Sequence, residues 1–314
     1  MSRVAFLTMA DRADYVIDDD VVIPELERRG ITVDEVPWTE EVDWSVYDLV
    51  VVRTTWDYQH DVERFLSVLE QIAEVTHVVN SLEVIRWNVH KSYLRALEAA
   101  GVLTVPTIWG VGLDDGQLSA LAMQEGVLKP VVGAGGADTF RIGSGMTAPT
   151  ASAQRADIIA RFVAREWMAQ PFVASVLTEG EYSLFWFASG PGGALEFSHA
   201  IVKRPKDGDF RVQEEWGGEI VAVDETATVL RELRVAGERV LAACGRERRE
   251  PLLQARVDLV RLADGRLALM ELELVEPSLY FRTSEVAATK FADAVCAWLK
   301  PDATTPRTPA TPSR

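Results

Sequence analysis

Short apolar runs and amphipathic stretches alternate along the first eighty residues. The apolar runs have the length of buried strands, and the stretches between them place apolar side chains on one helical stripe. This alternation predicts a small open parallel sheet covered by helices, so we assign residues 1–86 to an N-terminal Rossmann-like domain. The expected strands are 4–9, 31–36 and 48–54, and the expected helices are 24–29 and 62–73.

The pattern changes after residue 86, where signals of antiparallel pairing replace the parallel ones. A helix is expected to open at Asn88 and to end at Gly101, because Asn is a good N-cap and Gly a good residue just past a helix end. Strand signals then cluster around a glycine-rich loop and again in a C-terminal hairpin at 255–274. The fold class is therefore α/β, with α+β character in the C-terminal part. We expect a central subdomain over 87–180, a C-terminal subdomain over 181–300 and a disordered Pro/Thr-rich tail over 301–314.

Composition and charge argue against several classes of partner, among them nucleic acids and membranes. The chain has 32 Lys and Arg against 48 Asp and Glu, a net charge of −16, which repels nucleic-acid phosphates and anionic membranes. No apolar run reaches the roughly 20 residues that span a bilayer, and the N-terminus lacks signal-peptide features, so we expect a cytoplasmic protein. Two cysteines exclude a disulfide scaffold, and the four histidines are not spaced for zinc.

The glycine-rich loop at 133–136 differs from the two common nucleotide-binding loops. A dinucleotide fingerprint lies between the first strand and helix of a parallel unit, whereas this loop lies between two predicted strands well inside the chain. A Walker loop needs Gly-Lys-Ser/Thr before a helix, and that sequence is absent here. Two interpretations stay open: a flexible lid whose backbone N–H groups cover phosphates, with Lys129 supplying charge, or an ordinary glycine hairpin.

The C-terminal hairpin gathers charged side chains on one face. If the Asp-Gly pair at 264–265 forms a two-residue turn, Asp258 pairs with Glu271, and Arg256 then pairs with Glu273. Side chains alternate along a strand, so these four lie on the same face. Three carboxylates and one guanidinium leave an excess of negative charge, which suits a hard cation such as Mg²⁺. The alternative is the solvated face of an edge hairpin.

Six segments together are more specific than any one of them alone. They are RWNVHK (86–91), LKPVVGAGGADTFR (128–141), MAQPF with TEGEYS (168–172 and 178–183), HAIVKRP (199–205), DFRVQEEWGG (209–218) and ARVD with MELELVEPS (255–258 and 270–278). In this order they resemble the ATP-grasp superfamily, and within it the glutathione-synthetase-like branch. The resemblance covers most of the chain and implies an ATP-grasp fold, in which two α+β subdomains grip ATP beside the N-terminal sheet.

The resemblance also implies how the nucleotide is bound. Two lysines would contact the phosphates, a glycine lid would cover them, a backbone segment would hold the adenine, and a glutamate would accept the ribose hydroxyls. The residues are Lys91 and Lys129 for the phosphates, Gly133, Gly135 and Gly136 for the lid, the backbone around Gln170 for the adenine, and Glu181 or alternatively Glu179 for the ribose.

The same resemblance implies a reaction centre on the hairpin. Arg256 would steady the transferring phosphoryl group, and Asp258, Glu271 and Glu273 would bind two Mg²⁺ ions. The family often has Asn where this chain has Glu273, which leaves open how this residue coordinates metal. Two further arginines are candidates for a second basic contact to phosphate or substrate, with a surface role as the alternative: Arg211 and Arg204.

Substrate contacts are expected where the third predicted strand ends. The ligand crevice of an open parallel sheet lies beyond the carboxyl ends of its strands, and interdomain packing is the alternative for the aromatic residues there. The segment RTTWDY, taken with the other motifs, is similar to the actinobacterial ligases that include the cyclo-ligase closing the cycloserine ring from O-ureidoserine. The candidate substrate residues are Arg53, Thr54, Trp56 and Asp57, together with Ser278 in the last motif.

Members of this family join a carboxylate to an amine through an acyl phosphate. The resemblance therefore implies an ATP- and Mg²⁺-dependent ligase that releases ADP and phosphate and acts on an amino-acid-like or dipeptide-like small molecule. Modification of a peptide or protein, and a non-catalytic ATP-binding regulator, are the alternatives. A homodimer is the assembly usual in the family.

Overall fold

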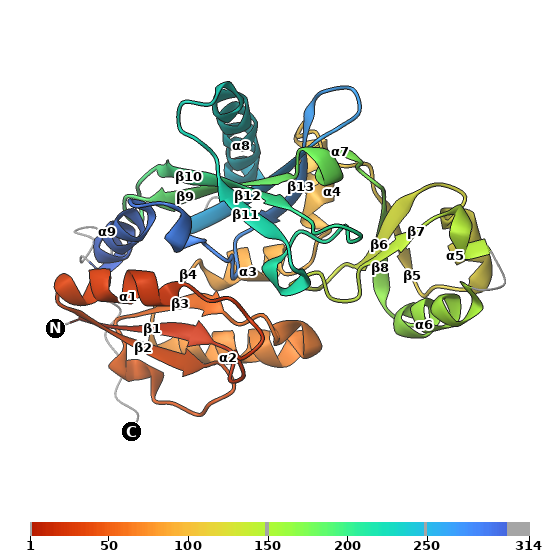
Figure 1. The fold of residues 1–314 in the computed structure, drawn as a ribbon. Helices are drawn as coiled ribbons and strands as arrows, with labels where there is room; N and C mark the ends of the chain where they lie inside the picture. The colour runs from red at the N-terminus through yellow and green to blue at the C-terminus, as the bar shows by residue number, and fades with distance from the viewer. Residues whose placement is uncertain (1, 148–150, 248–249, 300–314) are drawn as a thin grey trace.

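The computed structural model describes residues 2–147, 151–247 and 250–299 and contains three sheets (Figure 1). The expected disordered tail, 301–314, lies outside the described residues. No helix in the described part of the chain combines the length and the apolar character needed to cross a membrane. The helices are α1 (Asp19–Arg28), α2 (Val62–Val75), α3 (Leu82–Asn88), α4 (Tyr93–Ala99), α5 (Asp115–Leu121), α6 (Ser152–Phe162), α7 (Ser175–Thr178), α8 (Thr228–Glu247) and α9 (Ala287–Leu299).

The N-terminal sheet is parallel throughout, as the alternating pattern predicts. Its order is β2-β1-β3-β4, and β1 and β3 are almost entirely buried because helices cover both faces. Helix α2 buries Phe65, Leu69 and Ile72 against one face, and α1 buries Val22 and Leu26 against the other. The strands are β1 (Ser2–Thr8), β2 (Ile31–Pro37), β3 (Leu49–Thr54) and β4 (Val78–Val79).

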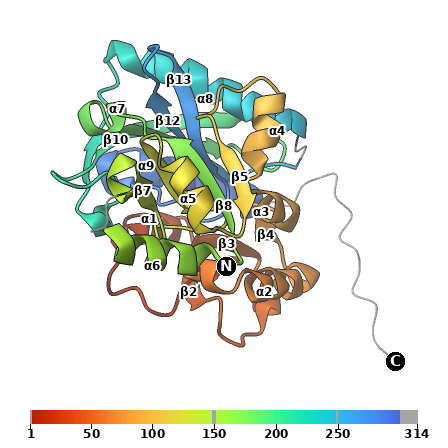
Figure 2. The same ribbon diagram turned by 90° about the vertical axis from the view of Figure 1, so that its right-hand side faces the viewer.

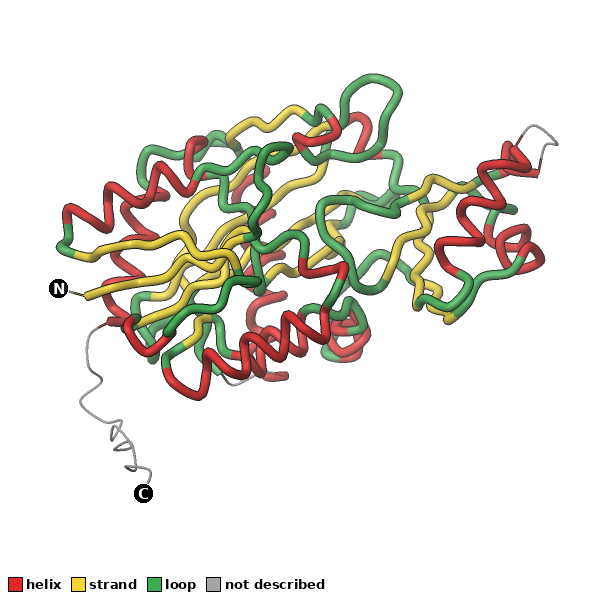
Figure 3. The backbone as a smooth tube through the Cα atoms, turned by 90° about the horizontal axis from the view of Figure 1, so that it is seen from below, coloured by secondary structure: helices red, strands yellow, loops and turns green. Residues whose placement is uncertain are grey.

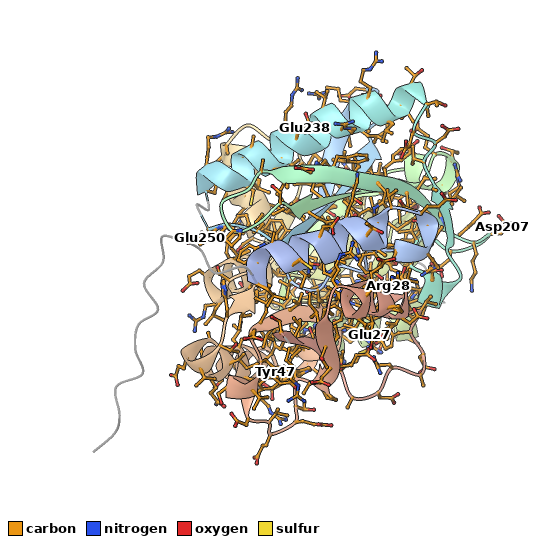
Figure 4. All side chains as sticks on the ribbon, turned by 90° about the vertical axis from the view of Figure 1, so that its left-hand side faces the viewer. Glu27, Arg28, Tyr47, Asp207, Glu238 and Glu250 are labelled. Atoms are coloured by element: carbon orange, nitrogen blue, oxygen red, sulfur yellow. The ribbon has the colours of Figure 1, made fainter. Side chains whose placement is uncertain are left out.

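The large C-terminal sheet is antiparallel, with the order β11-β10-β9-β12-β13. Helix α8 covers one face, and α9 lies between the other face and α1, on which Glu27 and Arg28 are labelled (Figure 4). Phe291 of α9 packs against both Phe6 and Phe187, so the N-terminal and large sheets share one core. The strands are β9 (Glu181–Ala188), β10 (Leu195–Arg204), β11 (Glu219–Ala222), β12 (Gln254–Arg261) and β13 (Leu267–Glu273).

A small antiparallel sheet of order β5-β8-β6-β7 stands apart from this shared core (Figure 3). Helices α5 and α6 lie on its outer face, which is toward the viewer in Figure 2, and they bury Leu118, Ile158 and Phe162. Its inner face is turned toward the large sheet. The strands are β5 (Ile108–Val111), β6 (Gly126–Pro130), β7 (Phe140–Ile142) and β8 (Glu166–Pro171).

The charged end of the hairpin has the predicted register, although the turn was predicted incorrectly. Leu262 pairs with Arg266 around a three-residue loop in which Gly265 has φ +86°, and a two-residue turn is therefore wrong. A β-bulge at Met270 then shifts the pairing back by one residue. As a result Asp258 still pairs with Glu271 and Arg256 with Glu273.

Asn88 ends a helix instead of opening one. It is the last residue of α3, a helix that crosses the expected domain boundary at residue 86, and its side-chain amide is buried against β13. The amide donates to the Leu272 carbonyl at 2.9 Å and accepts from the Leu274 N–H at 2.7 Å. The free edge of β13 needs these hydrogen bonds, and this tertiary demand outweighs the capping preference that the sequence suggests.

Buried His199 makes the stability of this core depend on pH. Its ring stacks on that of Phe185, with 4.2 Å between the ring centres. Its Nδ1 lies 3.0 Å from the Ser198 hydroxyl, and its Nε2 lies 3.0 Å from the Leu279 carbonyl. A neutral ring that donates from Nε2 and accepts at Nδ1 satisfies both neighbours. Burial, opposed by the Leu279 hydrogen bond and helped by nearby Lys290, lowers the His199 pKa to about 4.

We expect the free energy of unfolding to fall by about 2 kcal/mol between pH 7 and pH 5 because of His199. The folded pKa is below the unfolded value of about 6.5, so the unfolded chain binds the additional proton in this window. Urea unfolding at pH 7 and at pH 5 measures this fall in the free energy of unfolding. In His199→Gln the fall should be smaller by about 2 kcal/mol. An equal fall in the variant would show that His199 does not cause it.

Candidate functional site

One cavity lies between the charged face of the large sheet, the inner face of the small sheet and the end of the N-terminal domain. Strands β6, β8, β9, β10, β12 and β13 all contribute side chains to its lining. Strand alternation places Arg256 and Asp258, two residues apart on β12, on the face that lines it. Most of the sequence-predicted site residues meet here. Those in the lining are Trp56, Lys91, Lys129, Gly133, Gly135, Gly136, Gln170, Glu181, Arg211, Arg256, Asp258, Glu271, Glu273 and Ser278.

Arg256 and Asp258 form the buried centre of the hairpin's charged face. The Arg256 Nε and Nη2 donate to the Asp258 carboxylate at 3.0 and 2.8 Å, and Nη2 also contacts Glu273. Ser183 on β9 donates to Asp258 at 2.5 Å. Burial opposes ionisation of Asp258, but Arg256 and Lys203 outweigh it and lower the pKa to about 2. The hairpin face is therefore an ion-pair network inside the cavity and not a solvated edge.

The carboxylates beyond this centre carry more negative charge than their neighbours compensate. Burial, with Asp258 and Glu271 nearby, raises the pKa of Glu273 to about 8 despite Arg256. Burial and Glu271 likewise raise the pKa of Glu276 to about 7. Each hairpin carboxylate contacts a cation, and no group of three Asp, Glu, His or Cys side chains in the described residues is arranged as a ready metal site.

Three lysines approach these carboxylates from three strands or loops. The Lys91 ammonium lies 2.9 Å from Glu271 and donates to the Gly133 carbonyl at 2.8 Å. Lys129 on β6 differs, because within the described residues no carboxylate forms an ion pair with it, and its Nζ lies 4.0 Å from the Met270 sulfur. Burial lowers its pKa, although Glu271 opposes the shift. Lys129 is thus a cation that faces the cavity without an anionic partner.

Lys203 is the third lysine, and sequence reasoning missed it in favour of Arg204. Its Nζ lies 2.6 Å from Glu181 and 3.5 Å from Asp258, and these carboxylates raise its pKa although burial opposes them. Arg204 is the next residue on β10, so it points to the opposite side of the strand and does not line the cavity. The motif HAIVKRP contains both, and only the parity of the strand distinguishes them.

Only one of the two glutamates predicted to bind the ribose, Glu181 and Glu179, lines the cavity. Glu181 lines the cavity beside Lys203, whereas Glu179 forms an ion pair with Arg261 at 3.0 Å outside it. Gln170 is buried on β8, and its side chain donates to Thr107 at 3.0 Å. An apolar part of the cavity adjoins these residues. It is formed by Phe172, Val173, Val176, Phe210, Val212 and Met270, the last turned inward by the β-bulge.

The glycine-rich loop joins β6 to β7, as the sequence predicts, and it contacts the segment after β10 across the cavity. The Trp216 indole donates to the Gly135 carbonyl at 2.9 Å. Gly135 and Gly136 have φ of +60° and +71°, a conformation that favours glycine. Arg211 lies 3.4 Å from the centre of the Trp216 ring and donates to Asp209 at 2.7 Å. Two loops therefore cover the same opening.

The substrate candidates on the N-terminal domain divide into two groups. Trp56 lines the cavity, and its indole donates to the Glu276 carbonyl at 2.9 Å. Arg53 is fully buried away from it, paired with Asp19 at 2.5 Å. Thr54 is also buried away from the cavity, and Asp57 accepts a hydrogen bond from the Trp38 indole. Tyr58, the last residue of the segment RTTWDY, lines the cavity as well. The cavity residues that sequence reasoning missed on this side are Tyr15, Glu215, Glu276 and Tyr280.

Known proteins resemble this chain along almost its whole length. A family model described as the N-terminal domain of D-cycloserine synthetase DcsG matches residues 4–80. The cycloserine biosynthesis protein DcsG of Streptomyces lavendulae is 32% identical over 96% of this chain and 100% of its own. A crystal structure of D-cycloserine synthetase DcsG aligns with TM-score 0.78 and 30% identity, over 95% of this chain and 100% of that one.

A more distant match supports the fold alone. The carboxyaminoimidazole ribonucleotide synthase of Aspergillus clavatus, solved with ATP, aligns with TM-score 0.67 at 14% identity, over 95% of this chain and 77% of its own. Proteins solved as ATP-grasp ligases share the arrangement as well. The fold is therefore the ATP-grasp fold, and the protein is a ligase. With its sequence alignment extending from the N-terminal sheet through the acidic hairpin, this chain belongs to the DcsG family of ATP-grasp ligases.

Proposed function

We propose that this ligase uses ATP and Mg²⁺ to join a carboxylate to an amine through an acyl phosphate, on an amino-acid-sized substrate. The observation that carries the proposal is Lys129, which forms no ion pair with any described residue and faces a cavity that is also lined by Lys91, Lys203 and Arg256. Four cations around one cavity fit the phosphates of a nucleotide. Similarity to a cycloserine biosynthesis protein makes a cyclo-ligase acting on O-ureidoserine the specific form of the proposal.

The cavity offers a complete set of contacts for ATP. The apolar part beside Gln170 suits an adenine ring, with Phe172 and Phe210 in edge-to-face contact 6.4 Å apart. Glu181, which lines the cavity beside Lys203, would accept the ribose hydroxyls. Lys91 and Lys129 suit the phosphates, and the glycine-rich loop is able to cover them with backbone N–H groups.

The donor set of the hairpin fits Mg²⁺. Asp258, Glu271 and Glu273 supply hard carboxylate oxygens. Burial, followed by the nearby Asp258 and Glu271, raises the pKa of Glu273, and a divalent ion would neutralise this negative charge. These three residues would hold the ion together with phosphate oxygens. When bound, the metal would neutralise charge on the transferring phosphoryl group. Rearrangement of the present ion pairs would release the carboxylates.

The protein's own residues then position and protect the reactants. Arg256 is fixed by Asp258, so its guanidinium can stabilise charge on the phosphoryl group without reorganising. The glycine-rich loop and the segment 209–218 close the opening through Trp216 and so exclude water from the acyl phosphate. Arg211, half-buried beside Trp216, is available to contact phosphate or substrate once its bond to Asp209 opens.

ADP release with O-ureidoserine and with pools of amino acids tests the proposal. We expect release that depends on one amino-acid-like substrate, on Mg²⁺ and on ATP, with cycloserine as product if the cyclo-ligase form is right. Nucleotide binding without turnover on any of these compounds would favour a regulator. Turnover only with a peptide would favour the protein-modifying branch.

Lys129→Ala should weaken ATP binding by about 10- to 100-fold, the range expected when a charge-assisted hydrogen bond is lost. Lys129 forms no ion pair with a carboxylate of the described residues, so its charge is available to the phosphates. Calorimetric titration with a non-hydrolysable ATP analogue measures the change. Lys290→Ala on α9 is the matched control, because its ammonium donates to the Phe197 carbonyl and does not line the cavity. Equal affinity in both variants would remove Lys129 from the nucleotide site.

A further inference from the structure

The N-terminal end of the cavity has a chemical character of its own. Aromatic side chains form its wall: Tyr15 lies 5.2 Å from Trp56, and buried Tyr58 stacks on Phe65 at 4.9 Å. Trp56 and Tyr58 follow the third strand of the N-terminal sheet. Both contact Glu276, which comes three residues after the end of β13. The wall and the carboxylate therefore come from different domains and meet at this end.

Among the carboxylates of the cavity lining, Glu276 and Glu215 form no ion pair with any described residue, and only Glu276 also contacts Trp56. Asp258 and Glu273 contact Arg256, Glu271 contacts Lys91, and Glu181 contacts Lys203. No Lys, Arg or His of the described residues forms an ion pair with Glu276, and the Tyr58 hydroxyl interacts with its carboxyl. Lys91, the nearest cation to influence it, is already occupied by Glu271 and the Gly133 carbonyl.

A carboxylate without a cation, beside aromatic faces, is a suitable environment for an ammonium group. Cations are attracted to the faces of Trp and Tyr rings, and a buried carboxylate gains most from a positive partner. Lys129 and Arg256 line the same cavity and attract anions. An α-amino acid carries its ammonium and its carboxylate on one carbon, so a contact to each group would fix its orientation.

We propose that Glu276 binds the α-ammonium group of the substrate and thereby directs the substrate carboxylate toward the transferring phosphoryl group. This inference rests on the proposed ligase function. Tyr58 holds the Glu276 carboxyl, and Trp56 holds its backbone. An ammonium held in this way stays protonated, and so it does not compete with the intended nucleophile for the acyl phosphate. The site would select α-amino acids over carboxylates without an amino group.

The test compares two substrates with two proteins. For the unaltered protein, kcat/KM with O-ureidoserine should exceed that with 3-(ureidooxy)propanoate, its analogue without the amino group, by about 10- to 100-fold. In Glu276→Gln this discrimination should largely disappear, because KM for O-ureidoserine rises while the affinity for ATP stays the same. Glu219→Gln, on the exposed surface of β11, is the matched control and should keep the parent ratio.

The outcomes separate this inference from the proposed function. If the unaltered protein releases no ADP with any amino acid, the proposed function fails. If that protein is active and Glu276→Gln keeps its discrimination, only the role of Glu276 is overturned. Only the role of Glu276 is overturned as well if the discrimination is removed instead by Glu215→Gln, a change at the other cavity carboxylate that has no ion pair with a described residue. Should Glu276→Gln fail to fold, Tyr58→Phe keeps the stacked ring and removes only the hydroxyl, and an unchanged substrate ratio there would equally overturn the proposal.

Discussion

Replacement of Arg256 by alanine should lower kcat by about 10³-fold, while the ATP Kd changes by less than about 10-fold. The guanidinium is buried and fixed by three hydrogen bonds to Asp258, one to Glu273 and one to the Ser278 carbonyl. A cation held in this way stabilises charge that develops during phosphoryl transfer more than charge already present in ATP. Single-turnover ADP formation and calorimetric ATP titration measure the two quantities separately.

Two further variants control the Arg256 prediction. Arg256→Lys keeps the charge but loses the planar group that contacts Asp258 and Glu273 together, so we expect an intermediate rate. Arg266→Ala, at the exposed tip of the same hairpin, should leave the rate unchanged. Thermal unfolding of each variant is needed, because loss of Arg256 leaves two buried carboxylates with less compensation. A loss of ATP affinity with normal kcat would contradict the role assigned to Arg256.

The sequence predicted those parts of the fold in which one periodicity dominates. Buried apolar runs identified the parallel N-terminal sheet, and alternation placed Arg256, Asp258, Glu271 and Glu273 on one face. The register of these four was obtained although the turn was one residue too short, because the bulge at Met270 compensates. Neither the loop length nor the bulge has a strong local signal, since both depend on how β13 packs against its neighbours.

The residues that sequence reasoning misplaced depend on contacts between distant segments. The position of Arg53 near the end of β3 predicts a contact with a ligand, but in the structure Arg53 forms a buried ion pair with Asp19. The motif HAIVKRP predicts Arg204 as a site residue, but its neighbour Lys203 lines the cavity. A short motif does not reveal which of two successive side chains on a strand faces the site. Glu276 could not be recognised as a site residue from its own segment, because its contact with Trp56 joins positions 220 residues apart in the sequence. Pairings of this kind become visible only when the tertiary structure brings the segments together.

Asp258→Asn should lower kcat/KM by at least about 100-fold and raise the Mg²⁺ concentration needed for half-maximal activity. The carboxylate is ionised at every working pH, because Arg256 and Lys203 overcome its burial and hold the pKa near 2. Asparagine has nearly the same shape and can still accept the hydrogen bond from Ser183, so the substitution removes chiefly the negative charge. Steady-state ADP release over a range of Mg²⁺ concentrations measures both effects.

The Mg²⁺ dependence separates the two residues of this ion pair. Arg256→Ala should leave the half-maximal Mg²⁺ concentration nearly unchanged, whereas Asp258→Asn should raise it, because only the carboxylate can contribute an oxygen to the ion. Asp264→Asn, in the exposed turn of the same hairpin, serves as the matched control and should behave as the parent protein. If Asp258→Asn released ADP at the parent rate and at the same Mg²⁺ concentration, the hairpin would have to be structural, and the metal would have to bind elsewhere.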